Sequence, residues 1–220
     1  MTHIIITQRH NQDQYGQYRD SLESNYLSLF KSFDPYILAL PNTLLDTKAY
    51  LEKYQPTHIV LTGGDDIGGK FPPTKENPRE HTEWACLEWA ISNNIPVFGI
   101  CRGFQFINLF FGGKVCLDIH QLDSKHTPGN DHLISLSPDL NLDMEKAVVN
   151  SYHNQGIELS QLAPNLKLLA HKDGLVESFQ HHTLPITGVQ WHPEREDKLS
   201  KLNLLMLNYF INNEFFLENK

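Results

Sequence analysis

The chain has 220 residues, 40% of them hydrophobic and 20% charged, which is enough for one sizeable hydrophobic core and predicts a single domain over residues 1–220. Asp and Glu number 26 against 18 Lys and Arg, so the formal net charge is -8, and no basic run could neutralise a phosphate backbone. We therefore expect no nucleic-acid partner.

The first predicted element is the short apolar run HIIIT at 3–7, which no small-residue cleavage site follows, so it does not indicate a signal peptide. No window approaches the roughly 18 apolar residues that a membrane-spanning helix needs. The sequence thus predicts a cytoplasmic protein with no membrane partner. The three cysteines, Cys86, Cys101 and Cys116, form no CxxC pair, and we expect free thiols.

Short β-rich runs alternate with longer amphipathic segments through the first half of the chain. We expect strands at 3–7, 36–40, 58–62 and 95–100, and helices at about 14–32 and 81–94. The second half shows short strand patterns and a closing helical pattern, at 132–137, 147–151, 166–170, 174–180, 186–190 and about 197–213. This alternation is typical of an open, mostly parallel α/β sheet with some antiparallel strands.

Two segments with Pro and Gly breakers, 68–80 and 120–131, are predicted to be loops. In open α/β sheets, the loops at the carboxyl ends of strands build the binding site. Both segments are therefore candidate walls of a pocket.

The stretch GICRG (99–103) lies between a buried-strand pattern and an apolar helical pattern at 104–111. Its G-x-C-x-G spacing is that of a nucleophile elbow, a sharp strand-to-helix turn that projects the middle side chain, here Cys101. The turn places the sulfur at a helix N-terminus, where N–H groups and the helix dipole favour a thiolate. The alternative is a buried structural cysteine, which is what we expect for Cys86 and Cys116.

The segment WHPE (191–194) supplies a candidate partner for the thiol. In an extended segment residues i and i+2 point the same way, so the Glu194 carboxylate would lie beside the His192 imidazole. One ring nitrogen would bind Glu194 and the other would face Cys101, as in an arrangement of nucleophile, base and orienting acid. Taken alone, His-Pro-Glu also suits a solvated turn.

The segment LTGGDD (61–66) follows the strand pattern at 58–62. Its two glycines would let backbone N–H groups point into the pocket, and one such N–H together with that of Arg102 would make an oxyanion hole. A pair of glycines after a strand also suits an ordinary turn.

These motifs and a fourth carry a resemblance to a known family. In chain order LTGGDD (61–66), GICRGFQ (99–105), NSYHNQG (150–156) and GVQWHPE (188–194) resemble the class I glutamine amidotransferase superfamily. Within it, the chain is most similar to the stand-alone γ-glutamyl hydrolases of peptidase family C26. The resemblance implies a flavodoxin-like fold with helices on both faces of the sheet, and a catalytic triad of Cys101, His192 and Glu194.

The resemblance also implies substrate-binding roles around the nucleophile. Gly64 and Arg102 would donate their backbone N–H groups to the oxyanion, and Gln105 would recognise the glutamyl group. The pocket near the nucleophile would be lined by Asn150, Ser151, His153 and Gln155. None of the twelve histidines, such as His120, His126 and His132, has close ligand spacing, so we predict no metal site and no cofactor.

The predicted reaction is cleavage of a γ-glutamyl amide through a γ-glutamyl thioester, with release of glutamate. Members of the family act on γ-glutamyl-γ-aminobutyrate, on folyl polyglutamates and on γ-glutamyl-CDP-amidate in capsule phosphoramidate biosynthesis. For a nucleotide substrate of the last kind, Arg9, Lys70 and Arg79 are the candidate binding groups.

Two alternative functions and the oligomeric state stay open. The chain could be a glutaminase subunit that delivers ammonia to a separate synthetase, or a non-catalytic relative used for binding or redox sensing. The presence of Cys101, His192 and Glu194 argues against the second. A homodimer is compatible with each of these interpretations.

Overall fold

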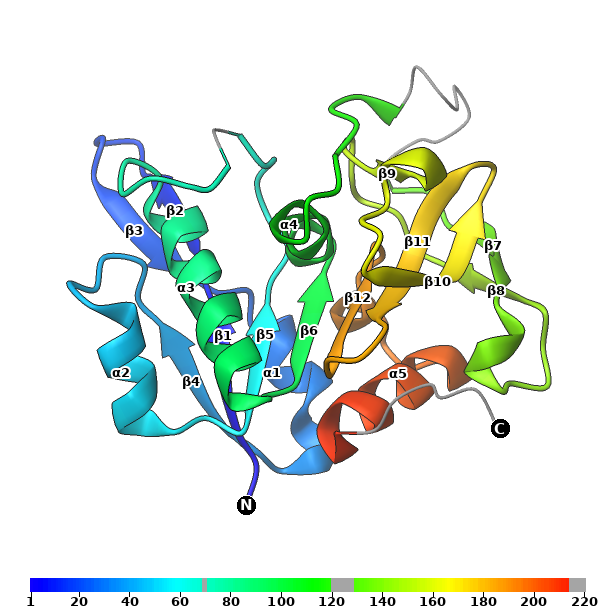
Figure 1. Cartoon of the computed structure of the whole chain (residues 1–220), viewed down its shortest axis with the longest axis horizontal. Helices are drawn as coiled ribbons and strands as arrows, with labels where there is room; N and C mark the ends of the chain where they lie inside the picture. The colour runs from blue at the N-terminus through cyan, green and yellow to red at the C-terminus, as the bar shows by residue number, and fades with distance from the viewer. Residues whose placement is uncertain (69–70, 120–128, 214–220) are drawn as a thin grey trace.

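The computed structural model describes residues 1–68, 71–119 and 129–213, and Figure 1 shows the path of the chain. Its strands are β1 (His3–Thr7), β2 (Arg9–Gln12), β3 (Tyr18–Ser21), β4 (Tyr36–Leu40), β5 (His58–Leu61), β6 (Val97–Ile100), β7 (His132–Leu136), β8 (Lys146–Val149), β9 (Ile157–Glu158), β10 (Leu166–Lys172), β11 (Leu175–His181) and β12 (Ile186–Val189). Its helices are α1 (Asn25–Leu29), α2 (Thr47–Tyr54), α3 (Pro78–Asn93), α4 (Arg102–Phe110) and α5 (Lys201–Asn212), with short 3-10 turns η1 (Lys31–Phe33), η3 (Pro138–Leu140), η4 (Leu159–Gln161) and η5 (Pro193–Arg195).

Within the described residues, ten strands form one sheet in the order β4-β1-β5-β6-β12-β11-β10-β7-β8, with β9 paired to β11. The strands from β4 to β12 in this order run parallel to one another. The remaining pairs are antiparallel and extend the sheet on the β12 side. This confirms the predicted α/β sheet with antiparallel additions.

Helices cover both faces of the sheet because the buried strands are apolar on both sides. Successive residues of β1 point to opposite faces, so Ile4 and Ile6 pack in one core and Ile5 in the other. The first core includes side chains of α1 and α5, such as Phe210. The second includes side chains of α2, α3 and α4, such as Phe104, and these helices lie in front of the sheet in Figure 1.

The predicted helix at 14–32 is wrong. The first part of this segment belongs to the hairpin of β2 and β3, and only α1 and η1 are helical. The side chain of Asp13 accepts the N–H groups of Tyr15 and Gln17, at 2.9 and 3.0 Å, and Gly16 has a φ of +76°. An Asp that caps its own turn followed by Gly at positive φ favours a tight turn over a continuous helix.

The predicted helix at 81–94 is present as α3 but begins earlier, inside the segment predicted to be a loop at 68–80. Asn77 caps it by accepting the Glu80 N–H, and Pro78 occupies the first turn, where a missing N–H costs nothing. It ends at Asn94 in the left-handed conformation. Lys70 and residues 120–128, with His120 and His126, lie outside the described residues.

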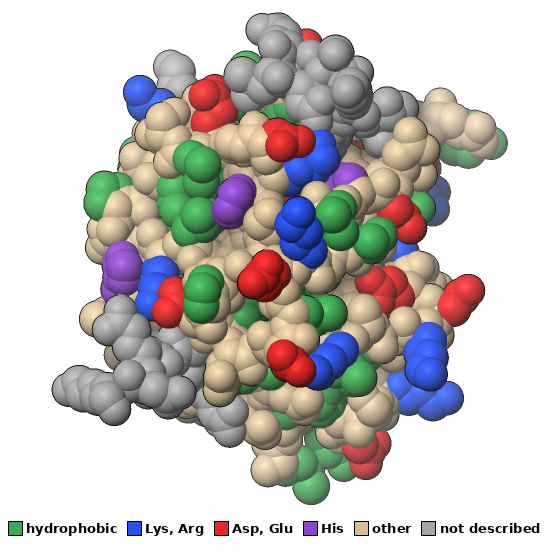
Figure 2. Space-filling model, turned by 90° about the vertical axis from the view of Figure 1, so that its right-hand side faces the viewer, with side chains coloured by type: hydrophobic (Ala, Val, Ile, Leu, Met, Phe, Trp, Pro, Cys, Tyr) green, Lys and Arg blue, Asp and Glu red, His purple; other side chains and the backbone are tan. Residues whose placement is uncertain are grey.

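The surface over β7 and β8 is shown in Figure 2, where Lys, Arg, Asp and Glu side chains are interspersed rather than gathered by sign. Among the helices that the structure describes, none has the length and apolar character needed to cross a membrane. The carboxyl ends of β5, β6 and β12 meet at one edge of the parallel part of the sheet. The predicted motifs follow these three strands, so this edge is the place to look for a site.

Candidate active site

Cys101 lies at the turn between β6 and α4. Its backbone has φ 51° and ψ -101°, and it is the N-cap residue of α4. A residue other than glycine in such a conformation costs of order 1–3 kcal/mol and persists only where its surroundings fix it. Here the Cys101 N–H donates to the Val189 carbonyl of β12 at 2.8 Å, which anchors the turn to the neighbouring strand. The sharp strand-to-helix turn predicted at Cys101 is therefore present.

Close packing explains the two glycines of the elbow. A Cβ on Gly103 would overlap the Leu61 carbonyl oxygen, and one on Gly99 would lie 2.6 Å from Cδ1 of Ile107. Any side chain at either position would push α4 away from β5 or β6. The glycines thus let the N-terminus of α4 approach the sheet, which places Cys101 at its edge.

His192 and Glu194 form a close pair after β12. His192 Nδ1 lies 2.5 Å from Glu194 Oε1, and both side chains are buried. The predicted contact is present, but the predicted reason for it is wrong: Pro193–Arg195 is a 3-10 turn rather than an extended segment, and His192 is its N-cap residue. With Nδ1 bound to Glu194, the His192 ring has Nε2 left for the sulfur.

The charges around His192 favour its protonated form. Burial lowers the pKa of His192, but the charge of Cys101, its hydrogen bond with the ring, and Glu194 outweigh burial and raise the pKa to about 9. At neutral pH the ring therefore holds its proton beside the sulfur.

A cavity of about 330 Å³ opens beside Cys101. Its lining consists of Gly64, Asp65, Asp66, Cys101, Arg102, Gln105, Tyr152, His153 and Asn154. Gly64 has a φ of +134°, and a Cβ there would lie 2.8 Å from both Arg79 Nη1 and Arg9 Nε, so the conformation and the space both require glycine. Polar groups dominate the wall, which suits a small polar ligand.

The structure brings only some of the predicted substrate-binding residues to the cavity wall. Gly64, Arg102, Gln105 and His153 line it. The other three are absent from the lining: Asn150 Nδ2 donates to the His192 carbonyl at 2.8 Å, and Gln155 binds both the N–H and the carbonyl of Ile67. These two side chains hold the loops of the site, and Ser151, which is buried, is also absent from the lining. The neighbours Tyr152 and Asn154 line the cavity instead.

Two further residues contact the site: Tyr26, which lies in none of the motifs, and Gln190, which lies inside the motif GVQWHPE but has no predicted role. Tyr26 of α1 accepts the Gly63 N–H at 2.8 Å, and burial, reinforced by the charge of Glu194, raises the pKa of its hydroxyl well above the usual value. Gln190 Nε2 lies 3.6 Å from the sulfur of Cys101, and its Oε1 accepts from Gln105. Tyr26 lay in the segment predicted to be a long helix, and no spacing pattern linked it to the motifs.

The three residues predicted to bind a nucleotide, Arg9, Lys70 and Arg79, are not equally placed to do so. Arg79 is 4% exposed and its guanidinium binds Glu83 and the carbonyls of Thr62 and Gly63, so it is not available to a nucleotide. Arg9 lies beside two residues of the cavity wall, Gly64 and Asp65, and pairs with Glu23 at 2.8 Å. Of the proposed set, Arg9 therefore stays a candidate, and Lys70 lies outside the described residues.

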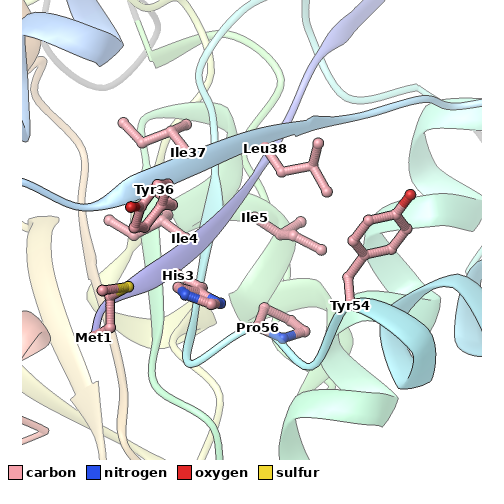
Figure 3. A pocket seen from close by; sticks show the side chains of 9 residues that line it. All are labelled: Met1, His3, Ile4, Ile5, Tyr36, Ile37, Leu38, Tyr54 and Pro56. Carbon is pink, nitrogen blue, oxygen red and sulfur yellow. The ribbon is translucent and has the colours of Figure 1, made fainter.

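A second cavity, of about 450 Å³, lies at the opposite end of the parallel strands (Figure 3). It is lined by Met1, His3, Ile4, Ile5, Tyr36, Ile37, Leu38, Tyr54 and Pro56, and is mostly apolar. It contains no pairing of a nucleophile with a base. Over the described part of the chain, no group of three or more His, Cys, Asp and Glu side chains could hold a metal ion.

Comparison with known proteins places this geometry in context. Residues 4–194 match the family model described as Peptidase C26. The chain is 34% identical over 190 residues to the glutamine amidotransferase-like protein YvdE of Lactococcus lactis, covering 77% of this chain and 79% of the relative. It is 30% identical over 209 residues to the gamma-glutamyl-CDP-amidate hydrolase of Campylobacter jejuni, covering 92% and 94%. It is 32% identical over 167 residues to the glutamine-hydrolyzing GMP synthase subunit of Thermococcus kodakarensis, covering 70% and 74%.

Among solved structures, the chain resembles the CTPS glutaminase domain of Trypanosoma brucei with a TM-score of 0.69 and 16% identity, covering 99% of this chain and 96% of that chain. At this level of identity the likeness concerns the fold alone. The expected flavodoxin-like α/β fold is confirmed.

Proposed function

The chain belongs to the peptidase C26 family of glutamine amidotransferase-like hydrolases, and from this premise we propose that it cleaves a γ-glutamyl amide bond by cysteine catalysis. The observation that carries the proposal is the geometry of three groups at one sheet edge. Cys101 projects from a strained elbow, and His192, bound to Glu194, contacts it beside a polar cavity.

In the proposed first half-reaction, the Cys101 thiolate attacks the γ-carbonyl carbon of the glutamyl group. The carbonyl oxygen gains negative charge, which the backbone N–H groups of Gly64 and Arg102 would stabilise. The C–N bond then breaks, and the leaving amine takes the proton held by His192. The product of this step is a γ-glutamyl thioester on Cys101 and a free amine.

In the second half-reaction, a water molecule attacks the thioester carbon while the now neutral His192 accepts its proton. The tetrahedral intermediate expels the Cys101 thiolate and releases glutamate. Glu194 holds the ring through Nδ1 in both steps, so the same nitrogen faces the sulfur and the water in turn. An oxyanion donor contributes about 10²–10³ in rate and general acid–base help about 10²–10⁴.

For the leaving amine we propose two candidates, the nucleotide amidate of γ-glutamyl-CDP-amidate and γ-aminobutyrate. The first is supported by the Campylobacter jejuni relative, whose named activity is hydrolysis of gamma-glutamyl-CDP-amidate and which matches this chain over nearly its full length. Arg9, half-buried beside Gly64 and Asp65 of the cavity wall, is the group that could meet a phosphate there. The second is a small amine, which suits the small volume of the cavity, about 330 Å³.

The proposal is tested by measuring glutamate release from glutamine, γ-glutamyl-γ-aminobutyrate, folyl diglutamate and γ-glutamyl-CDP-amidate. Release from one γ-glutamyl compound, but not from glutamine, supports a stand-alone hydrolase and names its substrate. Cys101→Ala should abolish the activity, whereas Cys116→Ala, which changes a cysteine outside the cavity, should retain it. Equal activity in the Cys101→Ala variant would refute the proposal.

A second candidate is a glutaminase subunit that passes ammonia to a separate synthetase, which the similarity to the GMP synthase subunit of Thermococcus kodakarensis favours. On this alternative, free glutamine is cleaved well only after the partner is added. The expected result would then be no glutamate release from any of the four compounds, while a thiol-alkylating glutamine analogue still modifies Cys101.

A further inference from the structure

We propose that Glu83 and Arg79 are positioning residues that fix the two oxyanion donors, Gly64 and Arg102, relative to one another. The inference rests on the proposed hydrolysis and assigns a role to buried side chains of α3 that lie outside the cavity. It follows from two sets of contacts, which lead from the Gly64 loop through α3 to the elbow, and from the burial of the groups that make them.

The first contacts hold the loop that ends at Gly64. Arg79 Nη2 donates to the carbonyl of Thr62 at 2.9 Å and to that of Gly63 at 2.8 Å. It also lies 3.1 Å from the Thr62 hydroxyl oxygen. One nitrogen therefore fixes two successive peptide groups directly before Gly64. Because each peptide plane is rigid, fixing the Gly63 carbonyl also orients the Gly64 N–H that shares its plane.

The second contacts run through one carboxylate. Glu83 Oε1 accepts from Arg79 Nε at 2.9 Å, and Glu83 Oε2 binds Arg102 Nη1. Thr7 of β1 donates a further hydrogen bond to Oε1 at 3.1 Å. The two oxygens of Glu83 thus connect Arg79, which binds the loop before Gly64, with Arg102, whose backbone N–H is the other proposed oxyanion donor.

The third observation is burial, which gives the bridge its rigidity. Glu83 is fully buried, and Arg79 and Arg102 are each only 4% exposed. Burial raises the pKa of Glu83, but the charges of Arg102 and Arg79 outweigh it and lower the pKa, so the carboxylate stays ionised. Charge-assisted hydrogen bonds between buried groups are short and directional.

A positioning role explains why charged groups are present here. Apolar side chains of similar volume often stabilise a fold as well as a buried ion pair does, so stability alone gives little reason for the network. The geometry of the oxyanion donors is a better reason for the network, because such a donor works only at hydrogen-bond distance from the developing charge. A displacement of about 1 Å can cost about 10²-fold in rate.

Glu80 provides a matched control on the same helix. It is also buried, and its Oε1 lies 3.5 Å from Arg102 Nη2. It accepts the Gly68 N–H at 3.3 Å but is not among the groups that bind Arg79. Glu80→Gln therefore removes a buried carboxylate next to Arg102 and leaves the bridge to the Gly64 loop in place.

The experiment compares Glu83→Gln, Arg79→Lys and Glu80→Gln, each with its thermal unfolding curve, on the best γ-glutamyl amide and on its γ-thioamide. Sulfur accepts hydrogen bonds weakly, so wild-type protein should prefer the oxygen compound through its oxyanion hole. In Glu83→Gln and Arg79→Lys we expect kcat to fall about 10²-fold with little change in KM. The ratio of rates on the oxygen and sulfur compounds should fall about tenfold in both variants. Glu80→Gln should keep the wild-type ratio.

Each outcome bears on the inference. A variant that loses only folded protein lowers both rates equally and leaves the ratio unchanged, which would refute the positioning role. If Glu83→Gln does not fold, Arg79→Lys decides, since it keeps the charge but cannot reproduce the fork that binds both Glu83 and the loop carbonyls. A fall of the ratio in Glu80→Gln equal to that in Arg79→Lys would also refute it. Absence of activity in wild-type protein would instead refute the proposed hydrolysis itself.

Discussion

The side-chain amide of Asn150 holds the backbone of His192 from both sides. Its Oδ1 accepts the His192 N–H at 2.8 Å, and its Nδ2 donates to the His192 carbonyl at 2.8 Å. Asn150 follows β8, the edge strand of the antiparallel part, whereas His192 follows β12. The proposed base is thus held from a strand that is not adjacent to its own.

This contact predicts the behaviour of Asn150→Asp, which keeps the acceptor for the His192 N–H but replaces the donor to the His192 carbonyl by an oxygen. We expect the His192 imidazole to lose its alignment with Cys101. The 3-10 turn after His192 is only three residues long, so the bonds from Asn150 contribute much of what holds this backbone in place. The rate constant kcat should fall roughly 10- to 100-fold while KM stays close to the wild-type value. Steady-state kinetics on the γ-glutamyl compound that the wild-type protein cleaves best would measure this, and an unchanged kcat would contradict it.

The pKa of His192 provides a second prediction. Burial lowers this pKa, and Cys101 contributes the largest effects that raise it to about 9. In Cys101→Ala these effects disappear while burial remains, so the pKa should fall by roughly one unit or more. Titration of the ring nitrogens by NMR would follow it. Cys116→Ala serves as the control and should leave the pKa in place.

The same raised pKa predicts how stability depends on pH. A histidine whose pKa is higher in the folded state than in the unfolded state stabilises the fold fully below the unfolded value of 6.5. This contribution is lost as the pH rises from 6.5 through about 9. With about 1.36 kcal/mol for each pKa unit, the loss is at most about 3 kcal/mol.

Chemical denaturation of wild-type protein and His192→Asn at pH 6 and pH 10 would measure this contribution. The free energy of unfolding of the wild type should fall more than that of the variant over this interval, because other titrating groups are common to both. A difference between the two proteins that does not change with pH would contradict the prediction.

Packing at the elbow predicts a strong effect of Gly103→Ala. The added Cβ would overlap the Leu61 carbonyl oxygen, which belongs to the backbone of a central strand and has no room to move. We expect destabilisation of about 3 kcal/mol or more and loss of activity. Gly68→Ala is the matched control, since a Cβ there meets nothing within 4 Å. Equal midpoints of thermal unfolding for the two variants would contradict this account.

The parts of the fold that the sequence predicted are those with strong local patterns. The strand of Val97–Ile100, the elbow at Cys101 and the amphipathic helix α3 all follow from apolar periodicity and glycine spacing. The segment at 14–32 was misjudged because Asp13 and Gly16 make a turn inside a pattern that also suited a helix. In this segment the turn-forming residues determine the structure, and the helix-like spacing of apolar residues does not.

Prediction of the site shows a similar division. The contact between His192 and Glu194 follows from their spacing, although the backbone between them differs from the expected one. The roles of Tyr26, Arg79 and Glu83 could not be predicted, because they depend on contacts with distant segments. Tyr26 binds Gly63, Arg79 binds Thr62, and Glu83 binds Arg102. Such contacts depend on how strands are ordered in the sheet, and no local pattern specifies that order.

The place of β12 in the sheet has a consequence for biosynthesis. Among the described strands it is the last in the chain, yet it lies between β6 and β11 and carries the segment that leads to His192. A nascent chain that has emerged only to residue 185 therefore has its cysteine without its imidazole, and both β6 and β11 have an open edge. Open edges favour pairing with other chains. When β12 inserts between β6 and β11, it closes both open edges and brings His192 to Cys101. The thiol should thus become reactive at the same step that protects the sheet from aggregation.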